Sequence, residues 1–218
     1  MTAEPEKTGA TGPRGRRRTR ANGEQSRERI LDAATEVATE RGYEGTTISL
    51  VSKKSGLPPT SIYWHFADKD DLIAAVIERS FGRWMAVLDL PAGGIDQDRV
   101  TEFGAQVAKA LLDAPDFLRL GLMLALERRP VEPRAREMFL EVRDRAFHRF
   151  EAIVRDLAPE LDDEGVRLLT TYAIAGADGL FIAKEVGGDS VDFLKLFDLH
   201  VRLVFQAAAK LMGAGEPT

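Results

Sequence analysis

The tetrapeptide Gly-Leu-Pro-Pro at residues 56–59 constrains the fold of this chain more than any other feature. It separates two short apolar-patterned segments, at about 47–55 and 59–66. Gly56 can adopt a positive φ without a Cβ clash, and Pro59 fits the first turn of a helix. The pattern therefore predicts two short helices that cross around a tight turn, which is a helix-turn-helix.

Hydrophobic residues recur with the helical period along nearly all of the chain from Glu24 onward. A first helix is expected up to about Gly42, and a long fourth helix from Asp68 to about Leu88. No segment alternates apolar and polar residues with a period of two, so the expected fold class is all-α, with about nine helices. Five further helices are expected at residues 97–113, 116–128, 133–157, 161–186 and 190–212.

Charge is distributed unevenly along the chain. Residues 1–66 carry 11 basic and 8 acidic side chains, a net charge of +3, whereas residues 67–218 carry 19 and 27, a net charge of −8. A basic head on an acidic body is expected when only one end of a protein touches a polyanion. We expect a disordered Arg-rich arm at 1–22, a helix-turn-helix domain at 23–69 and a larger helical domain at 70–218.

The helix-turn-helix continues into Asp-Lys-Asp-Asp-Leu at 68–72, and the helix before it carries Ile-Leu-Asp-Ala-Ala at 30–34. Over residues 24–75 this string resembles the DNA-binding signature of the tetracycline-repressor (TetR) family. The resemblance implies a homodimeric transcriptional regulator that binds a palindromic operator, and repression is the expected mode of regulation. It also implies that residues 70–218 dimerise and bind a small, apolar or aromatic effector that releases the DNA.

The same resemblance assigns roles to individual side chains of the head. Some positions match family residues that touch the DNA backbone, and others are expected at base edges in the major groove. Backbone contacts are expected from Thr47, Tyr63, His65 and Lys69, and base contacts from Thr60, Ser61 and Trp64.

Two positions depart from the family pattern. Position 58 holds proline where serine is frequent, and position 60 holds threonine where glycine is frequent. Both lie at the start of the recognition helix, so the exact base contacts stay open. Partial packing of Tyr63 and Trp64 on the fourth helix, and a local capping role for His65, are alternatives to DNA contact.

Five arginines stand within residues 14–20, directly ahead of the first helix. Such an arm can reach the minor groove and release counterions from phosphates. The alternative is a solvated tail that aids solubility. The arm residues expected at DNA are Arg16, Arg17, Arg18 and Arg20.

The last two helices carry broad apolar faces, and small residues recur every four positions on the first of them. This pattern is expected for a helix pair that meets its symmetry mate, although some of these residues must form the core of one protomer. The dimer candidates are Leu168, Tyr172, Ala175, Gly179, Ala183, Phe193, Phe197, His200 and Val204.

The middle helices are rich in phenylalanine and carry a few polar residues that could orient a ligand. The alternative for any one of these positions is ordinary core packing. The effector-pocket candidates are Phe103, Val107, Phe117, Leu120, Met123, Leu124, Glu127, Phe139, Phe147, Tyr172 and Asp178.

Several other classes of protein fit the sequence poorly. The chain has no cysteine, three isolated histidines and no phosphate-binding glycine loop, so we expect no catalytic site, metal or cofactor. No run approaches the roughly 18 uncharged apolar residues of a membrane span, and the start lacks an apolar signal segment. We therefore expect a cytoplasmic protein with no membrane partner. An activator, an effector-independent DNA-binding protein and a helical enzyme are the alternatives.

Overall fold

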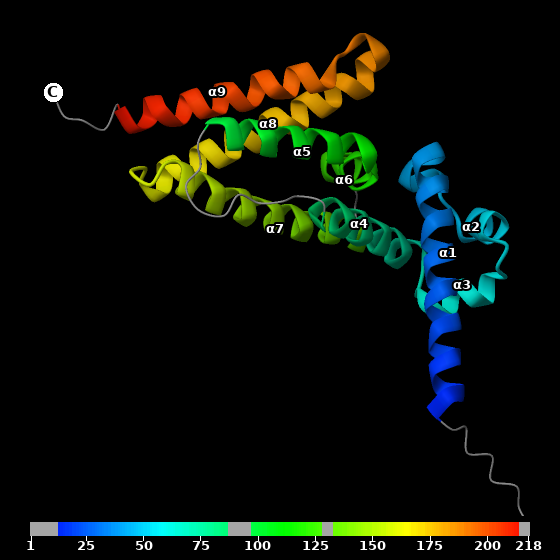
Figure 1. Cartoon of the computed structure of the whole chain (residues 1–218). Coiled ribbons are helices and arrows are strands. Elements are labelled where there is room, and N and C mark those ends of the chain that lie inside the picture. The colour runs from blue at the N-terminus through cyan, green and yellow to red at the C-terminus, as the bar shows by residue number, and fades with distance from the viewer. Residues whose placement is uncertain (1–12, 87–96, 128–132, 214–218) are drawn as a thin grey trace, which may run out of the picture. The chain divides into compact units, whose positions relative to one another are not determined.

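The computed structural model describes the backbone of residues 13–86, 97–127 and 133–213, and the side chains of 22–86, 99–127 and 133–213 (Figure 1). Nine α-helices, one 3-10 turn and no strand occur in these ranges, which confirms the all-α class. The chain divides into two units, the first ending at Val76 and the second beginning at Ile77. The sequence boundary was expected at residue 69. The first turns of the fourth helix instead belong to the N-terminal unit.

The N-terminal unit contains α1 (Pro13–Gly45), α2 (Ile48–Ser55), α3 (Pro59–His65) and the start of α4 (Lys69–Ala86). Gly42 interrupts α1 with a φ of 68°, at the position where the sequence predicted its end. The backbone of α1 already begins at Pro13, whereas residues 1–22 were expected to lack regular structure. Five of residues 13–22 are arginine, a good helix former, which allows the helix to extend towards the N-terminus.

The helix-turn-helix is fixed by local hydrogen bonds. The Thr47 side-chain oxygen accepts a hydrogen bond from the Leu50 backbone N–H (3.3 Å), which caps α2. Gly56 ends α2 with a φ of 66°, in the left-handed region that favours glycine. Arg29 of α1 donates to the Ser55 carbonyl oxygen (2.7 Å), one of the carbonyls that the end of α2 leaves without a helical partner. The predicted turn therefore forms around Gly56.

A closed apolar core joins these four helices. Its side chains come from one face of each helix, as the sequence periodicity predicted. Buried members include Ile30, Leu31, Val51, Ile62, Phe66, Leu72, Ile73 and Val76. The start of α4 is capped by Asp68, whose carboxylate accepts from the Asp71 N–H (2.8 Å).

The C-terminal unit is a bundle made by the rest of α4 and five further helices. They are α5 (Gln97–Asp113), α6 (Asp116–Leu126), α7 (Arg134–Leu157), α8 (Asp163–Gly187) and α9 (Phe193–Gly213), with a 3-10 turn at Gly188–Ser190. Helix α5 packs on α9, α9 on α8, α8 on α7 and α7 on α6. The bounds lie within three residues of those expected, because proline and glycine mark them.

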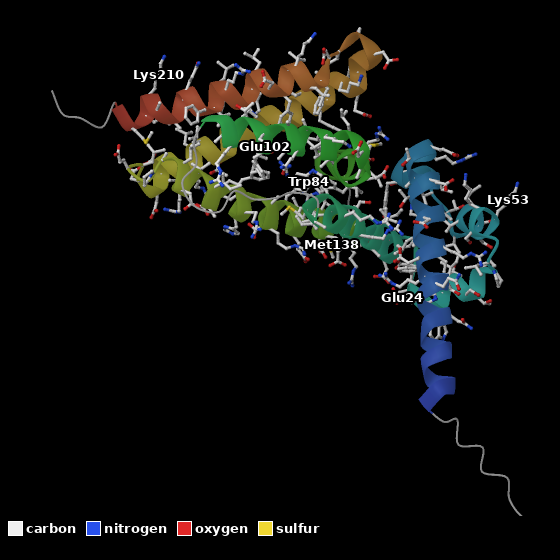
Figure 2. All side chains as sticks on the ribbon, viewed as in Figure 1. Glu24, Lys53, Trp84, Glu102, Met138 and Lys210 are labelled. Atoms are coloured by element: carbon white, nitrogen blue, oxygen red, sulfur yellow. The ribbon has the colours of Figure 1, made fainter. Side chains whose placement is uncertain are left out.

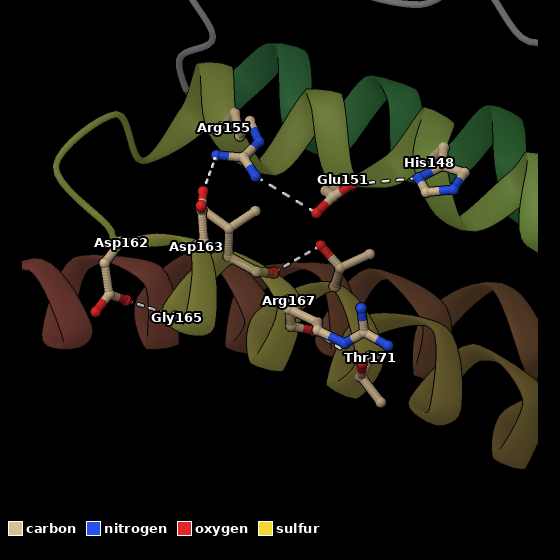
Figure 3. A network of polar contacts seen from close by, with 10 residues as sticks. His148, Glu151, Arg155, Asp162, Asp163, Gly165, Arg167 and Thr171 are labelled. Atoms are coloured by element: carbon tan, nitrogen blue, oxygen red, sulfur yellow. Dashed lines mark hydrogen bonds and ion pairs between the residues drawn. The ribbon is translucent and has the colours of Figure 1, made fainter.

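A polar network closes the corner between α7 and α8 (Figure 3). Arg155 contacts both Glu151 (3.5 Å) and Asp163 (2.8 Å). Asp162 caps α8 by accepting a hydrogen bond from the Gly165 N–H (2.8 Å). The Arg155 and Asp163 side chains are exposed, so their ion pair adds little stability, and the cap is the main local determinant.

Candidate nucleic-acid interface and ligand cavity

Helix α3 turns a row of polar-tipped side chains to solvent. Trp64 is 78 % exposed and Tyr63 56 %, and Thr60 is also exposed. Ser61 and His65 are half-buried beside them. A short helix with exposed hydroxyls and flat rings has the size and chemistry to enter a major groove about 12 Å wide.

The start of α3 explains how the helix forms without the serine expected at position 58. Pro58 has a φ of −64° and a ψ of 152°, and no side chain caps the helix. Pro59 occupies the first turn, and the Ser61 N–H donates to the Pro58 carbonyl oxygen (2.9 Å). The two prolines fix the backbone where a hydroxyl cap is absent, so the helix begins at the predicted residue.

The two backbone-contact candidates outside α3 already have partners within the unit. Thr47 is exposed, but its side-chain oxygen caps α2. The Lys69 Nζ donates to the Tyr43 carbonyl oxygen (3.3 Å), lies 4.2 Å from the centroid of the Tyr43 ring, and is 3.7 Å from the Glu44 carboxylate. A contact between Lys69 and a phosphate would have to replace these interactions.

His65 sits between the exposed face of α3 and the core. Burial lowers the pKa of His65, and the positive charge of Arg27 lowers it further, against an opposite effect of Glu24. The neutral imidazole is therefore favoured in the protein alone.

The arginine arm is described only in part. The backbone at Arg16, Arg17, Arg18 and Arg20 belongs to α1, and their side chains lie outside the described residues.

A cavity of about 140 Å³ lies inside the C-terminal unit. Its wall is almost wholly apolar, and Trp84 at the end of α4 contributes to it; Figure 2 labels this residue. The other lining residues are Val100, Phe103, Gly104, Val107, Leu111, Phe117, Leu118, Arg143, Ala146, Phe150, Ile153, Val154, Leu157, Ala173, Ile174, Ala177, Asp178, Phe197, His200, Val201 and Val204.

The charged groups at the cavity are paired with each other. Arg143 donates two hydrogen bonds to Asp178, from Nη1 to Oδ1 (3.0 Å) and from Nη2 to Oδ2 (2.5 Å). Burial raises the pKa of Asp178, while the guanidinium of Arg143 opposes that rise. His200 is held by a contact between its Nε2 and the Ala173 carbonyl oxygen (2.8 Å).

The pocket residues expected from the sequence fall into three groups. At the cavity are Phe103, Val107, Phe117 and Asp178. Packed in the bundle away from its wall are Leu120, Leu124, Phe139 and the half-buried Phe147. Exposed on the surface are Met123, Glu127 and Tyr172. Helical periodicity identified the buried faces of α6 and α7, but the cavity opens on only one part of them.

Most lining residues, Trp84 and Arg143 among them, were not pocket candidates from the sequence. Trp84 lies seven positions after Ile77 and three after Phe81 on α4. This spacing places the three side chains on one apolar face of the helix, and it could have identified Trp84 as a buried residue. Arg143 was not distinguishable by pattern from the other charged residues of α7, because its pairing with Asp178 depends on how α7 and α8 meet.

The outer surface of α8 carries an exposed apolar stripe. Exposed on it are Leu168, Tyr172, Ala175, Gly179, Ile182 and Val186, with Ala183 half-buried beside them. A matching stripe on α9 consists of Leu196, Leu199 and Leu203. The spacing of three and four places each stripe on one face of its helix.

Four dimer candidates lie elsewhere. Phe193 and Phe197 are buried within the protomer, against the expectation that they face a partner. His200 and Val204 line the cavity. Helix α9 is apolar on more than one side, so its periodicity could not separate the face towards α5 and α8 from the outer face.

Helix α8 is also the one described helix long and apolar enough to cross a membrane by length and composition alone. Core helices of soluble proteins pass the same test. Its window contains Asp178, which is paired with Arg143 of α7. Within the described ranges, no three His, Asp or Glu residues gather in a way that could hold a metal ion.

Comparison with known proteins matches the N-terminal unit to a family. Residues 30–76 match the model for bacterial regulatory proteins of the tetR family. The chain is 38 % identical over 61 residues to the HTH-type transcriptional regulator SrpR of Pseudomonas putida, a segment that covers 28 % of this chain and 29 % of that protein. It is 34 % identical over 64 residues to the regulator AcrR of Shigella flexneri, covering 29 % and 30 %. The matched segments thus span less than a third of the length of these curated relatives.

Solved structures match most of the chain in fold. The MbdR regulator of Azoarcus sp. CIB superposes with a TM-score of 0.68 at 18 % identity, covering 84 % of this chain and 98 % of that one. A member of the TetR transcriptional regulator family from Streptomyces coelicolor A3 has a TM-score of 0.55 at 25 % identity, covering 82 % and 90 %. Residues 30–76 thus match the tetR family of bacterial regulatory proteins, and the described fold is similar to those of solved regulators, one of them a member of the TetR family.

Proposed function

We propose that this chain is a transcriptional regulator, a repressor by preference, that binds a palindromic operator as a homodimer and releases it when a small apolar molecule enters its cavity. The observation that carries the proposal is the exposed face of α3, with Trp64, Tyr63 and Thr60 turned to solvent on a closed core. A tryptophan this exposed adds little to the core of the unit, so packing does not explain its presence there.

The homodimer is supported by the apolar stripes of α8 and α9. A continuous exposed apolar surface usually marks an interface, and a surface made of two adjacent helices can meet its own symmetry copy. Dimerisation would also increase sequence specificity. One short helix contacts few base pairs, and two symmetry-related helices contact twice as many.

The response to a ligand is supported by the cavity and by α4. Trp84 lines the cavity at one end of α4, and Leu72 and Ile73 near its other end belong to the core of the helix-turn-helix unit. A ligand that displaces Trp84 therefore acts on a helix shared by both units. Half-sites lie about 34 Å or a multiple apart, so a change of several ångströms between the two recognition helices weakens binding.

Selection from a randomised DNA pool, followed by footprinting, tests DNA recognition. We expect a protected sequence with two-fold symmetry and half-site centres separated by one helical turn or a multiple of it. Sequence-independent coating would favour an effector-independent DNA-binding protein, and absence of protection would overturn the proposal. An operator that lies upstream of a promoter without overlapping it would assign activation rather than repression.

The dimer is tested by placing a charge on the α8 stripe. We expect Tyr172→Glu to shift sedimentation from dimer to monomer and to weaken operator binding by about tenfold or more, since the second half-site is lost. Leu140→Glu on α7 is the matched control, because Leu140 is also an exposed apolar residue but lies outside both stripes. A Tyr172→Glu protein that remains dimeric would remove this interface from the proposal.

A further inference from the structure

One residue that lines the cavity has a polar atom without a partner among the described residues. Trp84 is only 4 % exposed and lines the cavity, and its Nε1 is buried without a hydrogen-bond partner among the described residues. Buried indole N–H groups usually find an acceptor, because an unpaired donor loses its hydration without compensation. This donor is therefore a group with which a ligand acceptor can form a hydrogen bond that the described residues do not supply.

The wall around Trp84 is aromatic. The ring centroid of Trp84 lies 5.3 Å from that of Phe117 and 6.2 Å from that of Phe150, and Phe150 lies 6.0 Å from Phe103. These rings form tilted contacts that a further flat ring can join. A volume of about 140 Å³ matches cavities that hold one aromatic ring, which are roughly 150 Å³.

The remaining polar groups at the wall already have partners, so they do not favour a charged ligand. Arg143 and Asp178 satisfy each other through two hydrogen bonds, and an ionic ligand would have to break that pair. His200 is engaged with the Ala173 carbonyl oxygen. The cavity therefore favours a ligand that is largely apolar and carries one acceptor for the Trp84 N–H.

We propose that the cavity selects neutral single-ring aromatic molecules that carry one hydrogen-bond-accepting oxygen, and that the Trp84 N–H is the residue group that recognises this oxygen. The inference rests on the proposed ligand-binding function of the cavity and adds the chemical class of the ligand. It makes Trp84 both the specificity determinant and the point at which the ligand touches α4.

Acetophenone and α-methylstyrene test this selectivity. The two have nearly the same shape, but a carbonyl oxygen in the first is a methylene group in the second. Binding of each is measured by calorimetry to the full chain, to Trp84→Phe and to Phe103→Leu. We expect Trp84→Phe to weaken acetophenone about tenfold and to change α-methylstyrene less than twofold, because it removes the donor and keeps a ring. Phe103→Leu, a cavity variant without a lost donor, should affect both probes alike.

A second readout needs no cavity variant. The chain has two tryptophans, and Trp64 is exposed, so Trp64→Phe assigns the two indole N–H resonances. We expect saturating acetophenone to move the Trp84 N–H proton downfield, as a new hydrogen bond does, and α-methylstyrene to leave it without such a shift.

The outcomes separate this inference from the proposed function. If both probes bind and Trp84→Phe affects them equally, acceptor recognition is overturned while a ligand-binding cavity stands. If neither probe binds, the inference is overturned, and ligand response must be tested with other classes. Footprinting of the operator judges DNA recognition independently of both results.

Discussion

The two units use their apolar residues in opposite ways. In the N-terminal unit, Ile30, Leu31 and Ile62 close a small core, and the groups proposed for function lie outside it on α3. In the C-terminal unit, the bundle leaves a cavity inside and an apolar stripe outside. A surface site can be changed without touching the fold, whereas an interior site shares its residues with the packing. Substitutions on α3 should therefore change function with little effect on stability, whereas substitutions at the cavity should change both.

The largest expected effect on stability comes from overpacking the α6–α7 contact. A Cβ at Gly121 would overlap the ring of Phe139, which is itself buried. We expect Gly121→Ala to lower the free energy of unfolding by about 2–3 kcal/mol in chemical denaturation. Gly82→Ala on α4 is the control, since nothing lies within 4 Å of its Cβ, and it should raise stability by about 0.5–1 kcal/mol. Equal effects of the two variants would contradict the close packing of α6 on α7.

The next effect tests the ion pair at the cavity. Arg143→Met leaves the Asp178 carboxylate without its partner, and we expect a loss of about 2 kcal/mol at pH 7. The pKa of Asp178 is already raised by burial, and losing Arg143 raises it further. A group with a raised folded pKa favours the folded state below its unfolded pKa, and that contribution is lost as pH rises through the folded pKa. The deficit should therefore shrink as pH falls from 7 towards 4, and a deficit that stays constant with pH would contradict this.

A smaller effect is expected from the arginine arm. Deleting residues 1–20 should weaken binding to all DNA sequences by about tenfold at physiological salt and flatten the salt dependence, since fewer phosphates are neutralised. Fluorescence anisotropy with the selected operator and with a scrambled duplex measures both quantities. Unchanged operator affinity would assign the arm to solubility.

The smallest effect concerns His65. Its pKa is lowered in the protein alone, chiefly by burial, and a nearby phosphate would raise it in the complex. Operator affinity should therefore rise about threefold as pH falls from 8 to 6, beyond any change seen with His65→Asn. Parallel pH profiles for the two proteins would place His65 away from the phosphates.

Local signals explain which features could be predicted from sequence. The turn at Gly56 and the start of α3 at Pro59 depend on residues that restrict their own backbone, so both were predicted correctly. Apolar periodicity located the helices but could not say what covers each face. Phe197 and His200 were therefore assigned to a partner, although the protomer places them at its cavity. No described residue accepts a hydrogen bond from the Trp84 N–H, and no sequence pattern predicts this, because it depends on neighbours from other helices.

The central claim is that the exposed face of α3 binds DNA without supporting the fold. Trp64→Ala tests it most directly, with operator affinity and free energy of unfolding measured on the same preparation. Because two symmetry-related contacts are lost, we expect affinity for the selected operator to fall about 100-fold. Since Trp64 is 78 % exposed, stability should change by less than about 0.5 kcal/mol. Unchanged affinity, or a loss of affinity that merely follows unfolding, would contradict the account.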